Sequence, residues 1–578
     1  MIVNVIHRPS AGRLYEMFRL QQSYAHELGL KVTLLIPYDF MFKPEVVADV
    51  LRDREQYGDE IGIWVGELTG GKMQETVPCK EPFLWLHTAP SKEKILRTVL
   101  EKFRETFGME PTCFGAYHMD ATSLSLLHSL CPAIKISIAG CFEEGVKVFH
   151  GCNNSWYLFN EGMPWGPWYP AKENSLRPAA GEEDWCGIIG VPHLCRDLAL
   201  SYEGRNDFFA SHPANVQRAM ANDGAVAPYT LNLLDVYRYQ ERYNDGFSYT
   251  NVFVGPNWLS GSPNVQDSDE ITQGLYREYL EYYAQLRDEG KLVSMHMSEF
   301  AAWYREHMPI ARAQVYNAKE VLYGSRKEYF WYGNSAMRVT FDLFQGGSVG
   351  DLRPLVARQP RCTGSDTPQK AIGSNPYLIH SQYRTGNAHH FEDGARTTLL
   401  LKKGEDTIDL ASCPSKIDTV SRDGDTVTVT LRPLPLTFAD GTAVTLYTTL
   451  TLYPDGRVAF ARRLDAPAGV TVTATEYVKG CWGTTEYPEE MGGIVLSAGE
   501  QTLTYRYEGR RVEDAGAAEV SATIPALETE MALCRRAGDF IAADAEEGYL
   551  FNPYYTLRQT AVLSAKKEMV TELCLRKK

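Results

Sequence analysis

IVNVIHRPSAGRLYEMFRLQQSYAHELGLKVTLLIP, residues 2–37, is the stretch of sequence that decides the fold class. It begins with an apolar run at residues 2–6 and ends with another at 31–37, each of the length of a buried strand. Between them, five apolar side chains repeat at helical spacing: Leu14, Met17, Phe18, Ala25 and Leu28. Gly29 suits the position just after a helix end. A strand, a helix and a strand in this order predict two parallel strands joined by a crossover helix.

The same alternation continues to about residue 310. Six further strands are predicted, at residues 60–66, 113–119, 133–140, 187–192, 249–256 and 292–297. Helices are predicted between them at residues 44–58, 91–108, 121–130, 267–290 and 298–308, with Ser91 and Asp267 as capping residues. We expect a seven- or eight-stranded (β/α) barrel over residues 1–320, with a doubly wound parallel sheet as the alternative.

Beyond about residue 320 the pattern changes to short alternating segments. Runs such as DTVTVTLRPLPL and AVTLYTTLTLY place apolar side chains at every second position and are separated by turns such as RDGD and YPDG. Only ALETEMALC, residues 526–534, is ambiguous between a short helix and a strand. We expect an antiparallel β-sandwich over residues 321–578, so the fold class is α/β followed by all-β.

Composition limits the function classes. The 578 residues carry a net charge of −15, with 44% hydrophobic and 23% charged residues. We expect no nucleic-acid partner and no membrane partner, because the sequence has neither a basic tract nor a run of 18 apolar residues. The 12 cysteines show no CxxC spacing and predict reduced thiols. We expect a cytoplasmic protein, or a secreted one if a leader was removed before residue 1; a homo-oligomer stays open.

Five carboxylates follow predicted strands of the first half: Asp39, Glu67, Asp120, Asp197 and Glu299. Parallel barrels place reactive groups at the carboxyl ends of their strands, and glycosidic bonds are cleaved by pairs of carboxyl groups. In GAYHMDATS, residues 115–123, Asp120 is a candidate reactive carboxylate, or alternatively a helix N-cap. Asp197 is the preferred acid/base partner and Glu67 is the second choice. Glu299 is typical of an ordinary first-turn helix residue.

Histidines and aromatic side chains are the candidate substrate-binding residues. Four histidines stand at or near strand ends: His7, His118, His193 and His296. They suit hydroxyl recognition; we expect no cofactor, and zinc held by these histidines is the alternative. Tryptophans that suit stacking on sugar rings lie in an insertion near residues 150–186 and after the strand at 249–256: Trp156, Trp165, Trp168 and Trp258. A hydrophobic plug is the structural alternative for the insertion.

A barrel followed by a β-sandwich resembles the glycoside hydrolase/deacetylase superfamily, which includes polysaccharide deacetylases and glycosidases of the α-mannosidase and amylopullulanase types. The local resemblance is best at QYGDEIGIWVGE, residues 56–67. On this resemblance, the two metal-binding histidines of a deacetylase would fall at Trp64 and Leu68, and its Asp-Asp pair near His7 and Arg8. Neither Trp nor Leu can hold a divalent metal, so metal-dependent deacetylation fits poorly.

The glycosidase branch of this superfamily carries its nucleophile at the end of strand four, which the resemblance places at Asp120, with Ser123 shortly after it. We therefore expect a glycoside hydrolase that cleaves small oligosaccharides or glycosides with a carboxylate pair, by a retaining mechanism. The alternatives are a metal-dependent carbohydrate deacetylase and a non-catalytic carbohydrate-binding protein.

Overall fold

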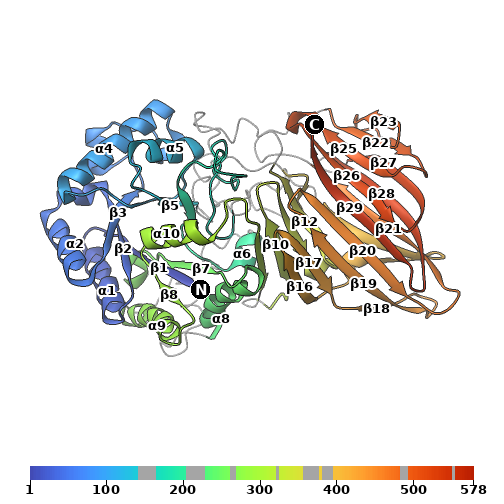
Figure 1. Cartoon of the computed structure of the whole chain (residues 1–578), viewed down its shortest axis with the longest axis horizontal. Helices are drawn as coiled ribbons and strands as arrows, with labels where there is room; N and C mark the ends of the chain where they lie inside the picture. Colours follow the sequence, from blue (N-terminus) through green and yellow to red (C-terminus); the bar gives the residue numbers. More distant parts are fainter. Residues whose placement is uncertain are drawn as a thin grey trace. The chain divides into compact units, whose positions relative to one another are not determined.

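The computed structural model describes most of the chain: residues 1–140, 164–203, 228–260, 269–320, 324–355, 377–380, 395–481, 493–549 and 553–578. The described residues form two compact units. The first includes Met1–Ala311, and the second includes Arg312–Pro360 and Ser374–Lys578. Figure 1 shows helices around a central sheet in the first unit and strands throughout the second.

The first unit contains an eight-stranded sheet in which every described pairing is parallel. Its strands are β1 (Ile2–His7), β2 (Val32–Pro37), β3 (Glu60–Val65), β4 (Cys113–Ala116), β5 (Ile136–Gly140), β6 (Ile189–Pro192), β7 (Tyr249–Val252) and β8 (Val293–Ser294). Seven follow the order β6-β5-β4-β3-β2-β1-β7, and β8 pairs with β1. All eight strand positions predicted from the sequence are confirmed.

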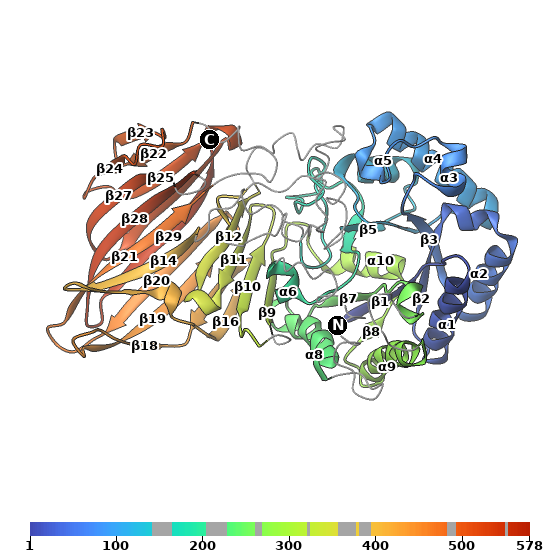
Figure 2. The same ribbon diagram turned by 180° about the vertical axis from the view of Figure 1, so that it is seen from behind.

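Helices separate these strands along the chain. They are α1 (Arg13–Glu27), α2 (Pro44–Tyr57), α3 (Gly71–Thr76), α4 (Ala89–Phe107), α5 (Ala121–Leu130), α6 (Leu198–Glu203), α8 (Pro228–Tyr239), α9 (Asp269–Asp288) and α10 (Met297–His307). Short 3₁₀ turns are η1 (Tyr38–Phe42), η2 (Leu84–Leu86), η3 (Gln240–Tyr243) and η4 (Pro256–Leu259). Figures 1 and 2 both show α1, α2 and α4 together along one side of the sheet.

Two helix caps lie elsewhere than predicted or outside the described residues. The N-cap of α4 is Thr88 and not Ser91, because Ala89 and Pro90 already adopt helical geometry and Pro is favoured in a first turn. The Ser91 hydroxyl instead contacts His87 Nδ1 at 3.0 Å. The predicted cap Asp267 lies outside the described residues.

The parallel sheet forms a partial barrel. Within the described residues, β6 and β7 stand at the two ends of the strand order and each pairs with one neighbour. The α/β class with a parallel sheet is therefore confirmed, and closure into a complete barrel stays a prediction. Because β1–β4 are adjacent and parallel, their carboxyl ends lie side by side at one edge of the sheet, where the loops after these strands meet.

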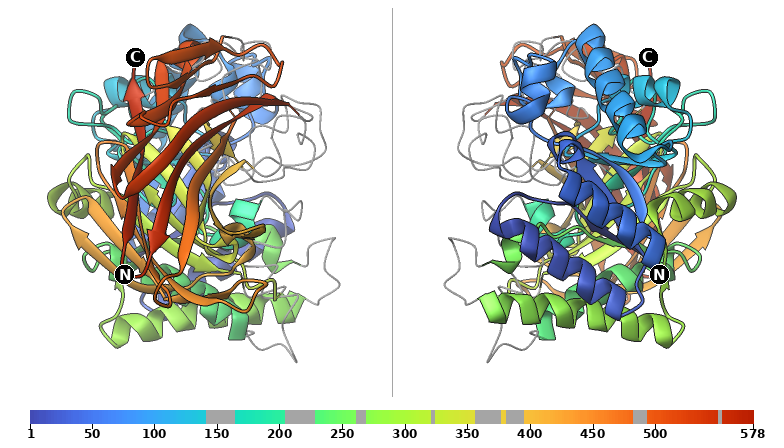
Figure 3. Two further views of the ribbon diagram at one scale, coloured as in Figure 1. Left: turned by 90° about the vertical axis from the view of Figure 1, so that its right-hand side faces the viewer. Right: turned by 90° about the vertical axis from the view of Figure 1, so that its left-hand side faces the viewer.

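The second unit consists of antiparallel sheets. A five-stranded sheet contains β9 (Gln314–Lys319), β10 (Glu328–Gly333), β11 (Met337–Asp342), β12 (Ser348–Pro354) and β13 (Ile379–His380). A six-stranded sheet contains β14 (Arg396–Lys403), β15 (Asp406–Asp409), β21 (Thr471–Gly480), β24 (Arg511–Glu513), β27 (Asp539–Tyr549) and β28 (Pro553–Ser564). Figure 3 shows the strong twist of the long red strands near the C-terminus.

A third sheet has ten strands: β16 (Ile417–Asp423), β17 (Thr426–Leu431), β18 (Leu434–Thr437), β19 (Ala443–Leu452), β20 (Arg457–Asp465), β22 (Val495–Ala498), β23 (Gln501–Thr504), β25 (Glu519–Ile524), β26 (Thr529–Ala537) and β29 (Glu568–Lys577). Short 3₁₀ turns in this unit are η5 (Leu343–Gln345), η9 (Leu410–Ser412) and η11 (Pro525–Leu527). The ambiguous segment 526–534 is mostly strand β26, which pairs with β25 and β29.

One apolar cluster joins the six-stranded and ten-stranded sheets. Leu399 and Leu563 from the former pack with Leu446 and Leu464 from the latter, and all four are buried. This shared core is the packing that a β-sandwich requires, and the complete sandwich topology stays a prediction. No helix in the described ranges is long and apolar enough to cross a membrane.

Candidate functional site

A cavity of 510 Å³ lies at the carboxyl ends of β1–β4. Its walls come from four loops: residues 8–11 after β1, 37–40 after β2, 64–68 at the end of β3, and Tyr117 after β4, with Met73 and Phe83 completing the lining. Loops at this edge of a parallel sheet carry side chains that the core does not use, which is why parallel α/β proteins place ligands there. The cavity is within the size range of small-molecule sites.

Two carboxylates line this cavity, Asp39 and Glu67. Asp39 is held in place because its Oδ1 accepts a hydrogen bond from the backbone N–H of Lys72, at 2.8 Å. Gly71 makes this approach possible, since its φ is +59° and a Cβ there would overlap the Asp39 carboxylate. Glu67 is exposed, and its Oε1 accepts a hydrogen bond of 3.1 Å from the Thr69 hydroxyl.

Aromatic rings form much of the remaining wall. Trp64 meets Tyr117 edge to face with ring centroids 5.1 Å apart, and Tyr117 meets Phe83 at 6.1 Å. Behind them, Phe253 lies 5.2 Å from Trp64, and His193 lies 4.9 Å from Phe253. Burial, and secondarily the nearby Arg8 guanidinium, lower the pKa of His193 to about 3, so this imidazole is neutral near pH 7.

Arg8 is the one cation among the described residues that line this cavity. Its guanidinium carbon lies 4.7 Å from the ring centroid of Trp64, 5.6 Å from that of Phe253 and 6.0 Å from that of Tyr117. Arg8 Nη1 also lies 3.4 Å from the Tyr117 hydroxyl. The site thus combines two carboxylates, one stacked cation and aromatic walls.

Asp120 occupies a different environment. It is the N-cap of α5 and is 2% exposed. Its Oδ2 lies 2.8 Å from the ammonium of Lys92, which is also buried, and its Oδ1 accepts a hydrogen bond from the Ser123 hydroxyl. Burial raises the pKa of Asp120, while Lys92 and Ser123 act in the opposite direction. Asp120 is absent from the described lining of the cavity, so its predicted catalytic role stays a prediction.

The other predicted acids are also spread out. Asp197 is buried between β6 and α6, beside Arg196, whose carbonyl accepts a hydrogen bond from the Tyr237 hydroxyl at 2.7 Å. Glu299 forms a capping box with His296 at the start of α10 and bonds Lys31 at 2.7 Å. Neither acid lines the cavity at β1–β4, whereas Glu67 does.

Among the described residues, no contact joins the predicted histidines to one another, and each has different partners. His7 Nε2 lies 2.9 Å from the Tyr276 hydroxyl, and burial lowers the pKa of His7 to about 3. His118 packs against Trp85 at 6.1 Å, and burial lowers its pKa to about 4. Only His193 contacts rings of the cavity wall. Over the residues that the structure describes, no three His, Cys, Asp or Glu side chains could jointly hold a metal ion.

The predicted stacking tryptophans are core side chains where they are described. Trp165 and Trp168 are each 1% exposed, and the Trp168 Nε1–H donates to the Ser175 carbonyl at 2.8 Å. Trp258 in η4 is 9% exposed, and Trp156 lies outside the described residues. The described tryptophans of this set present little ring surface for a sugar, and their stacking role stays a prediction.

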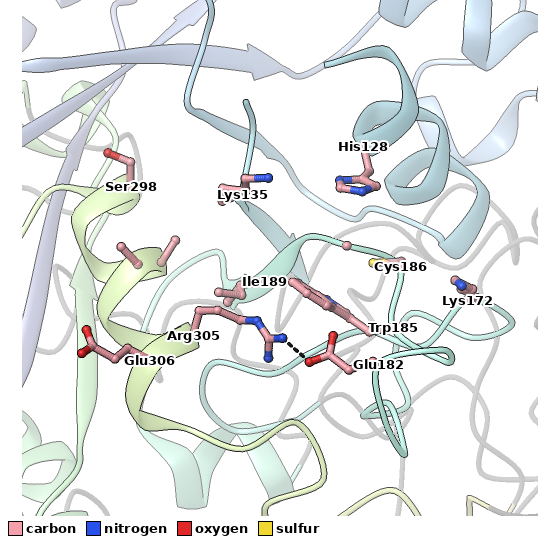
Figure 4. Close-up of a pocket in the computed structure, with 13 residues that line it drawn as sticks. His128, Lys135, Lys172, Glu182, Trp185, Cys186, Ile189, Ser298, Arg305 and Glu306 are labelled. Atoms are coloured by element: carbon pink, nitrogen blue, oxygen red, sulfur yellow. Dashed lines mark hydrogen bonds and ion pairs between the residues drawn. The ribbon is translucent and has the colours of Figure 1, made fainter. Parts of the chain in front are cut away.

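A larger cavity of 730 Å³ lies near the amino ends of β5 and β6 and along α10 (Figure 4). Glu182 and Arg305 form an ion pair there, and the two side chains point toward one another in Figure 4. The Glu306 carboxylate points away from the other labelled side chains. Parallel α/β folds carry out their chemistry at the carboxyl edge of the sheet, whereas this cavity lies at the amino edge. We therefore favour the cavity at β1–β4 as the functional site.

Sequence reasoning missed part of this site. The sequence marks Arg8 and Trp64 only as positions where deacetylase metal-site residues are replaced, and it assigns no role to Tyr117. Asp39 was among the strand-end acids but received no role. A usable signal was present, because residues directly after β1, β2 and β3 must meet at one edge once the strands are adjacent and parallel.

Comparisons with known proteins show weak similarity. No family model matches the chain, and no curated protein matches it. Among solved structures, a galactose mutarotase-like protein from Clostridium acetobutylicum is 8% identical, covers 46% of this chain and 98% of its own, and gives a TM-score of 0.31. The 4-alpha-glucanotransferase from Thermococcus litoralis is 11% identical, covers 100% and 99%, and gives 0.29. A protein proposed to be a polysaccharide deacetylase, from Mycobacterium smegmatis, is 14% identical, covers 53% and 91%, and gives 0.31. Similarity at this level assigns neither a family nor an activity.

Proposed function

We propose that this protein is a carbohydrate-active hydrolase that cleaves glycosidic bonds in the cavity at the carboxyl ends of β1–β4. The observation that carries the proposal is that two carboxylates, Asp39 and Glu67, line one aromatic-walled cavity at this edge of the sheet. The half-buried rings of Tyr117 and Phe83 offer flat surfaces that suit the apolar faces of sugars, and paired carboxyl groups suit glycosidic chemistry.

The two carboxylates differ in how they are held, which suggests different roles. Asp39 is oriented by the Lys72 N–H and by the close approach of Gly71, so it can act as the fixed nucleophile or as the base that activates water. Glu67 is exposed and lies beside Thr69, so it can exchange protons with solvent and act as the general acid. The acid protonates the leaving oxygen, and water supplies the new anomeric hydroxyl.

This assignment replaces Asp120 and Asp197 as the preferred pair. A nucleophile must reach the anomeric carbon, and the Asp120 carboxylate is enclosed with Lys92 and Ser123. Glu67, the second choice from sequence, is retained. A retaining or inverting outcome depends on the separation of the two carboxyl groups, which the stereochemistry of the product reports directly.

The test compares Asp39→Asn, Glu67→Gln and Asp120→Asn on a panel of chromogenic glycosides. We expect the first two to lose about 10²- to 10⁴-fold in kcat with an unchanged melting temperature. Asp120→Asn should lower the melting temperature. Glu55→Gln, an exposed acid on α2, is the matched control and should retain wild-type activity.

Other outcomes would reject the proposal in different ways. If Asp120→Asn alone abolished turnover without loss of stability, the nucleophile would be Asp120. Chelator-sensitive release of acetate from acetylated sugars would establish a metal-dependent deacetylase instead. Sugar binding without turnover of any glycoside would leave a carbohydrate-binding protein.

A further inference from the structure

We infer that the sugar bound at β1–β4 carries an anionic group, a carboxylate or a phosphate, and that Arg8 is the residue that binds it. This inference rests on the proposed function only in taking the cavity as the substrate site. The inference is drawn from two observations. Arg8 lies over the ring of Trp64 in the cavity wall, and the other charged side chains that line the cavity, Asp39 and Glu67, are both acids.

The position of Arg8 is fixed from two directions. It directly follows β1, whose last residues pair with β2, so its backbone belongs to the sheet edge. Its guanidinium stacks on Trp64 at 4.7 Å, and Trp64 is itself 2% exposed and held by the Tyr117 and Phe253 rings. A stacked guanidinium loses little further freedom when it binds a ligand, which favours recognition over a mobile surface cation.

Arg8 has no anionic partner in the part of the chain that the structure describes. No carboxylate oxygen of those residues lies within 4.0 Å of its guanidinium, so Asp39 and Glu67 do not neutralise it. The nearest polar contact is the Tyr117 hydroxyl at 3.4 Å, which is beyond the usual range for a hydrogen bond. His193 on the same ring cluster is neutral near pH 7 and provides no charge.

The geometry of a guanidinium then defines the ligand chemistry. The Arg8 guanidinium carbon lies 4.7 Å from the Trp64 ring centroid, within the range of a cation–π contact, and a guanidinium carries five N–H donors in one plane. Two parallel N–H groups match the two oxygens of a carboxylate or phosphate. Because the chain carries a net charge of −15, an anionic ligand needs such a local cation to offset long-range repulsion.

The charges also orient the substrate. No oxygen of the Asp39 or Glu67 carboxylate lies within 4.0 Å of a guanidinium nitrogen of Arg8, although all three residues line one cavity of 510 Å³. An acidic sugar can therefore place its anionic group at Arg8 and its scissile bond beside Asp39 and Glu67. The reverse orientation would bring the anion against two carboxylates. Arg8 is therefore a specificity-determining residue, and it takes no part in the proton transfers.

Equilibrium binding by titration calorimetry tests the inference without requiring turnover. The probes are glucuronate and glucose 6-phosphate, each compared with glucose, on the wild-type protein, Arg8→Gln and Arg8→Lys. We expect at least one of the two anionic sugars to bind about tenfold more tightly than glucose, or tighter still. The anionic sugar that binds more tightly identifies the preferred anion as a carboxylate or a phosphate. Arg8→Gln should remove this preference, and Arg8→Lys should restore only part of it because ammonium lacks the planar fork.

Lys80→Gln is the matched control, since Lys80 is exposed, makes no ion pair with the described residues and removes the same charge. It should keep the full anionic preference. Equal binding of glucose and both anionic sugars by wild type would overturn the inference, as would an anionic preference that survives in Arg8→Gln. Thermal melting checks folding. If Arg8→Gln does not fold, Arg8→Lys tests the inference through the planar fork, and an anionic preference as large as that of wild type in Arg8→Lys would overturn it.

Failure of the inference and failure of the proposed function are distinguishable. An anionic preference lost in Arg8→Gln, with no glycoside cleaved, would retain the binding site and reject the hydrolase. Cleavage of neutral glycosides that is unaffected by Arg8→Gln would retain the hydrolase and reject the anionic substrate. Inorganic phosphate that binds as tightly as glucose 6-phosphate would also reject it, because the sugar would then contribute nothing.

Discussion

The ammonium of Lys92 lies 2.8 Å from the carboxylate of Asp120, and both side chains are buried, one in α4 and one at the start of α5. Each charge is acceptable in this environment only because the other is present, since an isolated buried charge is costly. The pair links α4 and α5, two helices that contact each other. Its loss should therefore affect folding first.

We predict that Lys92→Met lowers the free energy of unfolding by about 3–5 kcal/mol, because it leaves a buried carboxylate without a countercharge. Urea denaturation followed by circular dichroism measures this change. The double variant Lys92→Met/Asp120→Leu should recover most of the loss, since it removes both charges. A double variant as unstable as the single one would show that packing, and not charge, sets the cost.

Acid should destabilise the first unit through its buried histidines. The pKa of His7 is lowered from its ordinary value of 6.5 to about 3 in the folded state, mainly by burial. The unfolded chain therefore binds a proton at this site between about pH 6.5 and 3 that the folded chain does not, so stability is present above pH 6.5 and is lost as pH falls. Acidification below about pH 6.5 therefore lowers the free energy of unfolding.

The corresponding measurement is urea denaturation between pH 7 and pH 5 for wild type and His7→Gln. Glutamine does not titrate, so the variant should lose stability with a slope smaller by up to one proton, about 1.4 kcal/mol per pH unit. His307→Gln is the matched control, because His307 is exposed on α10. Parallel pH profiles for wild type and His7→Gln would contradict the prediction.

Gly71→Ala should disturb the candidate site. Its φ of +59° costs an alanine about 1–2 kcal/mol, and the added Cβ would overlap Asp39. We expect Asp39 to move and kcat on a cleaved glycoside to fall by at least about tenfold, the size of a 1.4 kcal/mol change. Gly70→Ala is the control, since Gly70 has an extended φ of −142° and nothing within 4 Å of its Cβ position. Equal activities for the two variants would disprove the positioning role.

Gly187→Ala should destabilise the chain near the larger cavity, which Gly187 lines. Gly187 has a φ of +92°, and an added Cβ would lie 2.6 Å from the His128 ring. Backbone strain and the clash together should lower the free energy of unfolding by about 2 kcal/mol or more. Gly181→Ala, with nothing within 4 Å of its Cβ position, should change it by less than about 0.5 kcal/mol. A similar melting temperature for both variants would refute this.

Local patterns were sufficient to predict most elements of secondary structure. The strands and helices of the first unit repeat apolar side chains at periods that a single segment of sequence displays, as in the α4 face formed by Ile95, Val99, Phe103 and Phe107. The segment 526–534 could not be assigned in this way, because its strand state depends on hydrogen bonds to β25 and β29, which come from other parts of the chain.

In the candidate site, too, the sequence determined some features and the tertiary structure decided others. From the sequence alone it followed that Asp39, Glu67 and Asp120 come after strands of a parallel α/β unit, because strand ends are visible as the ends of apolar runs. Which carboxylates reach the cavity was decided only by tertiary structure. The Asp120 carboxylate pairs with the ammonium of Lys92, a helix residue 28 positions earlier. Asp39 instead accepts a hydrogen bond from the backbone N–H of Lys72, and the Arg8 guanidinium lies over the Trp64 ring. Contacts between side chains so distant in sequence depend on how helices and loops pack over the sheet, and no local periodicity records that packing.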